Sequence, residues 1–167
     1  TSAQGRFDIL TADPTRTLVT RGLRTEVGGQ GESRLSLSDP FALLAEALGP
    51  VRVGAADLPF CGGAIGFFGY DLARRLMRLP SLALDAEDIP DMAVGIYDWA
   101  LIVDHETRLS HLVAQDQATL LEYWGLLASA LERPARRLPG AGFRVLDRVE
   151  SNLSRSRYLE AIARIQD

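Results

Sequence analysis

The alternation of apolar and polar residues along the chain predicts many short strands separated by turns. Stretches rich in Val and Thr, in which every second side chain is apolar, are typical of strands that bury one face. Glycine, aspartate and proline punctuate these stretches, and such short turns favour antiparallel pairing. The predicted strands cover residues 7–11, 17–20, 23–27, 33–37, the first half of 58–80, 92–103, 108–114 and 143–149.

Three segments show the apolar spacing of amphipathic helices, and a fourth is predicted to be a short helix at residues 71–79. The first helix starts at a cap, Ser38 or Asp39, followed by Pro40, and it ends at Gly49. The second covers residues 117–132, and the third follows the cap Ser154. Because few helices come between runs of strands, the pattern predicts an α+β fold with largely antiparallel sheets layered with helices. The inward-facing residues are expected to be Leu120, Leu121, Trp124, Leu127 and Leu131 in the second helix, and Tyr158, Ile162 and Ile165 in the third.

Residues 92–103 are almost continuously apolar, which predicts one long central strand with both faces covered. Trp99 in this run and Trp124 in the second helix are both interpreted as core residues. Residues 104–107 are predicted to form a hairpin loop in which His105 is exposed.

Composition narrows the possible functions. The chain has 167 residues, which suits one domain or one domain and part of another. Its net charge of −4 argues against a nucleic acid or an anionic membrane surface as the main partner. No apolar run is long enough to cross a membrane, and the start is unlike a signal peptide, so a cytoplasmic location is expected.

Residue types exclude several kinds of chemistry. All 18 basic side chains are arginine, so Schiff-base chemistry and a P-loop lysine are excluded within this chain. The single cysteine, Cys61, is expected to be a small buried apolar residue. The acidic residues at 85–91 could bind a cation, but such a segment is more typical of a solvated loop. No catalytic constellation and no metal site is predicted.

A glycine-rich stretch invites comparison with phosphate-binding loops. Its glycines follow the spacing GGxxGxxG, and the residues between them are large and apolar. This pattern favours a strand with close backbone contacts over a loop around a phosphate. The glycines are Gly62, Gly63, Gly66 and Gly69.

The end of the chain suggests a larger protein. Residues 132–142 have the composition of a linker, and the last helix keeps its apolar stripe without a glycine or asparagine cap. We therefore expect the chain to be a piece of a longer protein.

Two long motifs carry a resemblance to a known family. LPFCGGAIGFFGYDLARRLMRLP at 58–80 and PDMAVGIYDWALIVDH at 90–105 resemble the N-terminal domain of component I of aminodeoxychorismate synthase (para-aminobenzoate synthase). This enzyme belongs to the anthranilate synthase component I superfamily. RFDILTADP at 6–14 fits the early strand of the family, and residues 151–167 resemble the first helix of its chorismate-binding domain. The resemblance implies an N-terminal regulatory or structural domain at 1–150 and the start of the catalytic domain at 151–167.

The resemblance also implies an activity for the parent protein. Component I aminates chorismate to 4-amino-4-deoxychorismate for para-aminobenzoate and folate biosynthesis. Ammonia comes from a glutamine amidotransferase, component II, and magnesium holds chorismate in the C-terminal domain. The catalytic groups, including a lysine, lie in that domain, so the present chain is expected to be inactive alone, with no cofactor of its own.

Some relatives bind tryptophan in the N-terminal domain, and part of that pocket maps to Gln4, Gly5, Arg6 and Phe7. A relative has an aromatic residue at the position of Gln4, which is a departure in this chain. Two alternatives remain. One is the same domain of anthranilate synthase component I with a tryptophan feedback pocket, and the other is a free-standing regulatory module that binds a small molecule.

Overall fold

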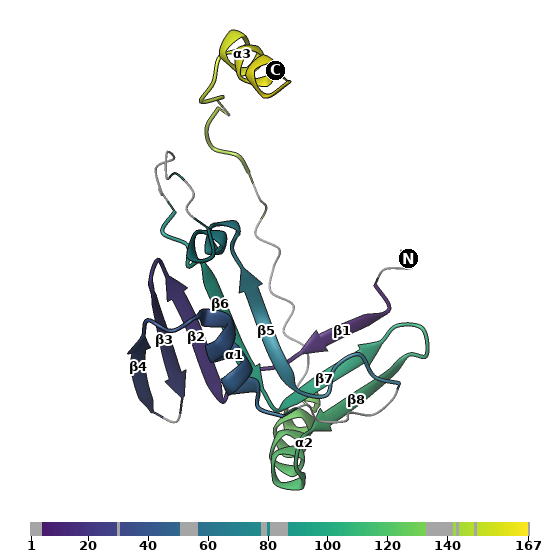
Figure 1. The fold of residues 1–167 in the computed structure, drawn as a ribbon. Coiled ribbons are helices and arrows are strands. Elements are labelled where there is room, and N and C mark those ends of the chain that lie inside the picture. Colours follow the sequence, from purple (N-terminus) through teal and green to yellow (C-terminus); the bar gives the residue numbers. More distant parts are fainter. Residues whose placement is uncertain are drawn as a thin grey trace. The chain divides into compact units, whose positions relative to one another are not determined.

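The computed structural model describes residues 5–29, 31–50, 57–77, 80, 87–132, 142, 144–148 and 150–166. The chain divides into two units, residues 1–133 and 134–167, and each is described by itself. In the first unit the described strands form two antiparallel sheets, and the prediction of an α+β fold is confirmed (Figure 1).

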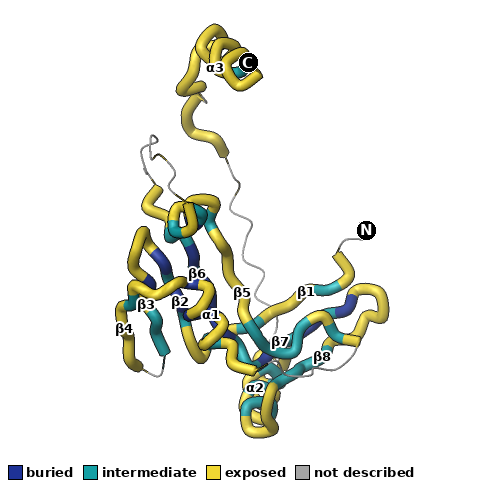
Figure 2. Tube along the Cα trace, viewed as in Figure 1, coloured by how far each residue is buried: buried dark blue, intermediate teal, exposed yellow. Residues whose placement is uncertain are grey.

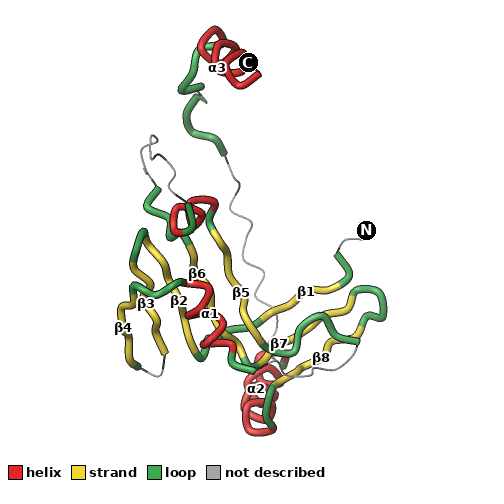
Figure 3. Tube along the Cα trace, in the orientation of Figure 1, coloured by secondary structure: helices red, strands yellow, loops and turns green. Residues whose placement is uncertain are grey.

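The larger sheet has five strands in the order β4-β3-β2-β6-β5. Strands β2, β3 and β4 form a local meander, whereas β6 enters from far along the chain and lies between β2 and β5. Two residues separate β2 from β3, and two separate β3 from β4. The 3-10 helix η1 follows β5 along the chain, and α1 lies on one face of the sheet (Figure 3). The bounds are β2 (Arg16–Arg21), β3 (Arg24–Gly29), β4 (Glu32–Ser36), β5 (Gly63–Phe68), β6 (Met92–Tyr97), α1 (Pro40–Leu48) and η1 (Tyr70–Arg75).

Helix α1 has the predicted signals at both ends. The Asp39 carboxylate accepts hydrogen bonds from the backbone N–H groups of Phe41 and Ala42, so Asp39 is the cap. Gly49 ends the helix at φ 66°, where a residue with a Cβ would be strained. Leu43 and Leu44 of the helix are buried in the main core, and the inner strands β2 and β6 carry buried residues (Figure 2). This core comprises Leu18, Leu43, Leu44, Leu72, Met92, Val94 and Ile96.

The smaller sheet has three strands in the order β1-β7-β8, and helix α2 packs against β8. The central strand β7 aligns Asp104 with Phe7 on β1 and Trp99 with Ala114 on β8. Asp116 caps α2 by accepting from the N–H of Thr119 at 2.9 Å. The bounds are β1 (Phe7–Leu10), β7 (Trp99–Asp104), β8 (Leu109–Ala114) and α2 (Gln117–Leu131).

The expectation of one long strand at 92–103 is wrong. The chain breaks at Asp98, so that β6 is an inner strand of the five-stranded sheet and β7 is the central strand of the three-stranded sheet. The expected central position holds for both halves. An uninterrupted apolar run is equally compatible with one long buried strand and with two consecutive buried strands, which is why the pattern did not separate them.

The inward face predicted for α2 is partly wrong. Trp99 is buried as predicted, with 6% of its surface exposed, but Trp124 on α2 is 64% exposed. Leu121 and Leu131 are also exposed, whereas Leu120 and Leu127 are partly buried. The helix is apolar on more than one side, so periodicity alone could not choose the face that meets the sheet.

In the second unit the structure describes helix α3 (Arg155–Gln166). The Ser154 hydroxyl accepts from the N–H of Arg157 at 3.4 Å, as expected of a cap. The strand predicted at 143–149 is not present in the described residues 144–148, which have no regular secondary structure, and residues 143 and 149 lie outside the described part.

Candidate functional site

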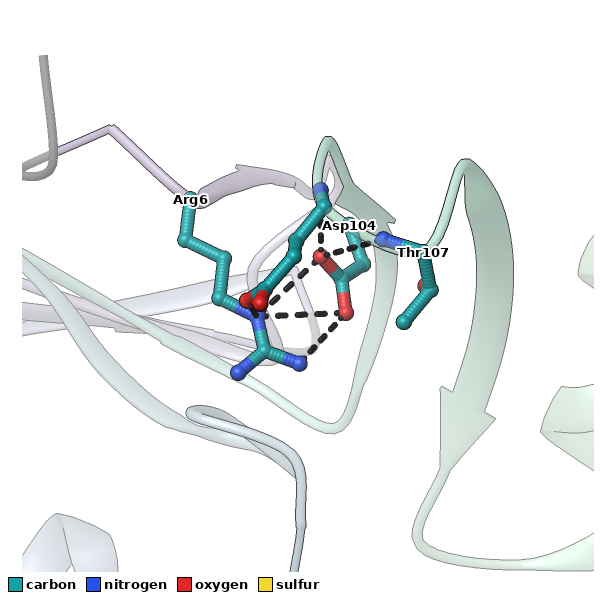
Figure 4. Close-up of polar contacts among 4 residues, drawn as sticks. Arg6, Asp104 and Thr107 are labelled. Carbon is teal, nitrogen blue, oxygen red and sulfur yellow. Dashed lines mark hydrogen bonds and ion pairs between the residues drawn. The ribbon is translucent and has the colours of Figure 1, made fainter. Parts of the chain in front are cut away.

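The segment predicted to contribute to a ligand pocket lies at the start of β1. Gln4 falls outside the described residues, and Gly5 is exposed just before the strand. Arg6 and Phe7 follow, and β1 pairs with β7 so that these residues lie beside the β7–β8 hairpin. The structure therefore brings Arg6 together with a second group of residues that begins at Asp104 (Figure 4). Phe7 lies opposite Asp104 in the pairing of β1 with β7.

Arg6 and Asp104 form a forked ion pair across 98 positions of sequence. The Arg6 Nη2 donates to Asp104 Oδ2 at 2.8 Å, and its Nε donates to Oδ1 at 3.1 Å. The side chain of Asp104 is 5% exposed, whereas that of Arg6 is 47% exposed. Glu106 adds a second carboxylate at 3.1 Å from Arg6 Nε, but its own side chain is 71% exposed. The pair is thus a half-exposed guanidinium held by one covered carboxylate.

Asp104 is held in its charged form by several donors. Its Oδ1 also accepts from the backbone N–H groups of Glu106 at 2.9 Å and Thr107 at 3.3 Å. The hydrogen bond from Arg6 is the largest cause that lowers the pKa of the Asp104 carboxyl far below its usual value, and the backbone donors add to it against the cost of burial. The same hydrogen bond raises the pKa of the Arg6 guanidinium. Asp104 is therefore a fixed anion that serves as an anchor.

The guanidinium of Arg6 also lies over the ring of Phe7. Its central carbon is 4.6 Å from the ring centroid, which is a cation–π contact. The backbone carbonyl of Arg6 accepts from His105 N–H at 2.8 Å, and His105 Nε2 lies 2.7 Å from Asp8 Oδ2. His105 is exposed as predicted. Strand β1 is therefore tied to the hairpin by several polar contacts.

A second set of contacts anchors α2 to the smaller sheet. The rings of Trp99 and Tyr123 stack with centroids 3.9 Å apart. Trp99 Nε1 donates to the carbonyl of Ala12 at 3.1 Å, and the Tyr123 hydroxyl donates to Asp13 Oδ2 at 3.4 Å. Burial raises the pKa of the Tyr123 phenol, and the nearby Asp13 carboxylate adds to the rise. The sequence pointed to Trp99 but not to Tyr123, because nothing local predicts which aromatic residue of α2 faces the sheet.

The glycine-rich stretch forms strand β5, as predicted. Gly66 lies opposite Val94 on β6, and a Cβ at Gly66 would meet the backbone of Ala93 and the Cα of Val94 at 2.6 Å. The small residue allows a close approach of two backbones inside the sheet. The close approach of β5 to β6 therefore explains why a glycine stands at position 66, and no bound phosphate is needed to explain it.

Comparison with known proteins identifies the family. The sequence profile of the chorismate binding enzymes matches residues 2–167. The chain belongs to this family. It is 42% identical over 164 residues to aminodeoxychorismate synthase component 1 from Salmonella typhimurium, covering 96% of this chain and 35% of that protein.

Two anthranilate synthase components are also similar to this chain. Anthranilate synthase component 1 from Thermus thermophilus is 33% identical over 171 residues, covering 98% of this chain and 36% of that protein. The crystal structure of anthranilate synthase component I from Streptococcus pneumoniae superimposes with a TM-score of 0.68 at 26% identity, covering 81% of this chain and 31% of that one. The chain spans about a third of the length of the curated relatives that it matches.

Within the described part of the chain, no group of three or more His, Cys, Asp or Glu side chains is placed to hold a metal ion. Of the acidic segment at 85–91, Asp85 lies outside the described residues, Asp88 pairs with Arg21, and Asp91 accepts from the N–H of Gly22. None of the helices described is long and apolar enough to cross a membrane.

A shallow cleft of about 290 Å³ lies where the two sheets meet, beside the break at Asp98. Thr15, Gly63 and Gln115 contribute to its walls. Its acidic residues are Asp98 and Asp116, and Asp116 already caps helix α2.

Proposed function

We propose that this chain is the N-terminal, non-catalytic part of an aminodeoxychorismate synthase component 1. The parent protein would aminate chorismate to 4-amino-4-deoxychorismate, for para-aminobenzoate and folate biosynthesis. The observation that carries the proposal is 42% identity over nearly the whole chain to a component 1 of which the chain covers only 35%. On this proposal residues 1–150 form the N-terminal domain, and residues 151–167 begin the chorismate-binding catalytic domain.

The residues of the chain support a division of labour within the parent protein. Asp104 and Arg6 satisfy each other, so neither offers a free base or a free acid. By its resemblance to component I, the parent protein would hold magnesium in the part of component 1 that this chain does not cover. Among the described residues of the chain, no group of three or more His, Cys, Asp or Glu side chains is placed to hold a metal ion. Ammonia would come from a glutamine amidotransferase component II, and the reaction would take place in the cytoplasm.

The experiment compares the purified chain with the complete product of the gene that encodes it. Each protein is incubated with chorismate, magnesium and an ammonium salt, and the products are separated by chromatography. We expect 4-amino-4-deoxychorismate from the complete product and none from the chain alone. Product from the chain alone would contradict a non-catalytic role. Anthranilate from the complete product would instead place the protein among the anthranilate synthases. The chain is 33% identical to one of these, component 1 from Thermus thermophilus.

We also propose that Gly5, Arg6 and Phe7, with Gln4 before them, contribute to a pocket for tryptophan. Supporting this, the Phe7 ring is held beneath a fixed guanidinium at the start of β1. Calorimetric titration of the complete product with tryptophan tests the pocket. Phe7→Ala is expected to abolish the heat of binding, whereas Leu23→Ala, which removes a 70% exposed side chain in the turn between β2 and β3, should leave it unchanged. Absence of binding by the parent protein would refute the pocket.

A further inference from the structure

We propose that one flank of helix α2 is a surface on which two copies of this protein pack together, as an antiparallel pair of helices. The flank comprises Leu121, Trp124, Gly125 and Ala128. The inference goes beyond the proposed function, because it concerns self-association and does not depend on the reaction of the parent protein.

Helix α2 carries more apolar surface than the smaller sheet covers. No residue of the helix is buried, and most of its length is exposed (Figure 2). Leu121 and Trp124 lie three residues apart on the flank, where they are 62% and 64% exposed. Tryptophan is enriched at the centres of protein interfaces, because it buries a large apolar area when a partner covers it. The exposed indole therefore marks this side of the helix as a contact surface.

Gly125 stands near the middle of the helix, which runs from Gln117 to Leu131. A glycine weakens a helix interior relative to alanine. No other described part of the chain comes within 4 Å of a Cβ built at this position, so packing within the chain does not require a glycine here. A second helix that crosses at this point would benefit from it, because small side chains allow two helix axes to approach closely.

The flank fits a second copy of itself. In an antiparallel pair whose two-fold axis passes between Trp124 and Gly125, Leu121 of one copy faces Ala128 of the other, since both are equally far from the axis. A large side chain then meets a small one. The two Trp124 rings lie beside each other at the axis, where they can pack as an offset pair. No residue of the flank is charged, so like charges do not meet at its centre.

The size of the flank predicts a weak dimer. An aromatic side chain offers about 150–250 Å², of which Trp124 leaves roughly 150 Å² exposed. Together with Leu121 and the smaller residues, each copy can bury roughly 400–500 Å², or about 800–1,000 Å² in total, which is near the lower limit of specific interfaces. We therefore expect an equilibrium between monomer and dimer, with a dissociation constant of roughly tens to hundreds of micromolar.

Sedimentation velocity of the complete gene product, over a range of micromolar concentrations, tests the association. Leu121→Ala should weaken dimerisation by roughly tenfold, because the two-fold symmetry removes the contact twice. Leu126→Ala is the matched control: it makes the same change at a leucine that is 59% exposed, but on another side of the helix, and should stay within about twofold. A monomer at every concentration, as would be found if the rest of the parent protein covered the flank, would overturn the inference. Equal dissociation constants for the two variants would also overturn it.

Charges at position 117 test the antiparallel arrangement. In this arrangement Gln117 of one copy lies near Glu132 of the other, because both are equally far from the axis. At low salt, Gln117→Lys should tighten the dimer by roughly threefold and Gln117→Glu should weaken it by about as much. The effect on the helix alone has the opposite sign, since a negative charge stabilises a helix N-terminus and a positive charge destabilises it. A change in folding stability therefore cannot imitate this result. The same sign for both variants, or no effect of either, would overturn the antiparallel pairing.

Discussion

The two sheets of the first unit are stabilised in different ways. The five-stranded sheet buries a continuous apolar cluster under α1 and η1, with Leu18 and Met92 fully covered. The three-stranded sheet buries fewer side chains, chiefly Trp99, Ala100 and Ile102, and one of its covered residues is the charged Asp104. It is held by directed contacts instead, namely an aromatic stack, an indole hydrogen bond and a forked ion pair.

This difference has a consequence for how each sheet tolerates change. An apolar cluster distributes its stabilisation over many small contacts, so a single truncation leaves the remaining contacts in place. Directed polar contacts have only a few partners, and removing one partner leaves the other unsatisfied. We therefore expect the stability of the smaller sheet to depend on a few identifiable residues. The larger sheet should lose stability in proportion to the volume of buried side chain that a substitution removes.

Trp99→Ala should have the largest effect. It removes the stacking partner of Tyr123 and the donor to the Ala12 carbonyl, and truncating a buried tryptophan costs about 3–5 kcal/mol. Because domains of this size have about 5–15 kcal/mol of stability, the variant should be close to unfolded in urea melts. His105→Ala, in the loop of the same sheet, removes an exposed pair with Asp8 and should cost at most about 1 kcal/mol. A Trp99→Ala protein as stable as the parent would refute the importance of the stack.

Leu18→Ala tests the larger sheet. Leu18 is fully buried at the centre of the apolar cluster, and such a truncation costs about 2–5 kcal/mol depending on how far the cavity collapses. Leu23→Ala is the control, because Leu23 is 70% exposed in the next turn and should change stability by less than about 0.5 kcal/mol. Similar urea midpoints for the two variants would mean that the cluster does not stabilise the sheet as described.

Gly66→Ala tests whether the larger sheet also depends on the close approach of the β5 and β6 backbones at Gly66. The added methyl group would meet the backbone of Ala93 and Val94, which cannot rotate away, and we expect a loss of roughly 1–3 kcal/mol. Gly125→Ala makes the same change in α2, where no atom lies within 4 Å of the new methyl, and should stabilise the chain by about 0.5–1 kcal/mol. Thermal melts showing the same sign for both changes would contradict the close approach.

Acid should weaken the smaller sheet through Asp104. Its pKa in the folded chain lies below the ordinary value of 3.8, so folding favours the ionised form. The contribution is complete well above pH 4 and is lost as the pH falls below that value and approaches the folded pKa. Asp104→Asn, which cannot ionise, should show a lower urea midpoint at pH 7 and a smaller further drop on acidification than the parent. Parallel pH profiles would show that the ion pair does not contribute.

Much of the fold could be predicted from local pattern. The caps of α1, the strand at 63–68 and the hairpin at 104–107 follow from residues that are adjacent in sequence. The division of 92–103 between two sheets could not be predicted, because both halves are apolar and only Asp98 marks the break. A single polar residue within such a run is a usable signal, since a buried strand rarely carries a carboxylate.

The candidate site was only half visible in the sequence. The motif that carries Arg6 and Phe7 pointed to the start of β1, but Asp104 was noted only as part of a loop. Their contact spans 98 positions and follows from the pairing of β1 with β7, which no local periodicity encodes. The choice of Tyr123 over Trp124 as the partner of Trp99 has the same cause, because the rotation of α2 depends on the surface it meets.

The pairing of β1 with β7 also affects the order in which the strands pair during folding. Phe7 aligns with Asp104, so β1 cannot find its partner until nearly a hundred further residues have been made, whereas β2 and β3 pair across a short turn. Closing a long loop carries an entropic cost that must be met before the contact forms, and distant pairings therefore slow folding. We expect the β2–β3–β4 meander to acquire protection first and β1 last in pulse-labelling refolding experiments. During synthesis on the ribosome, β1 would then emerge before β7, and it would be among the last of these strands to take its place in a sheet.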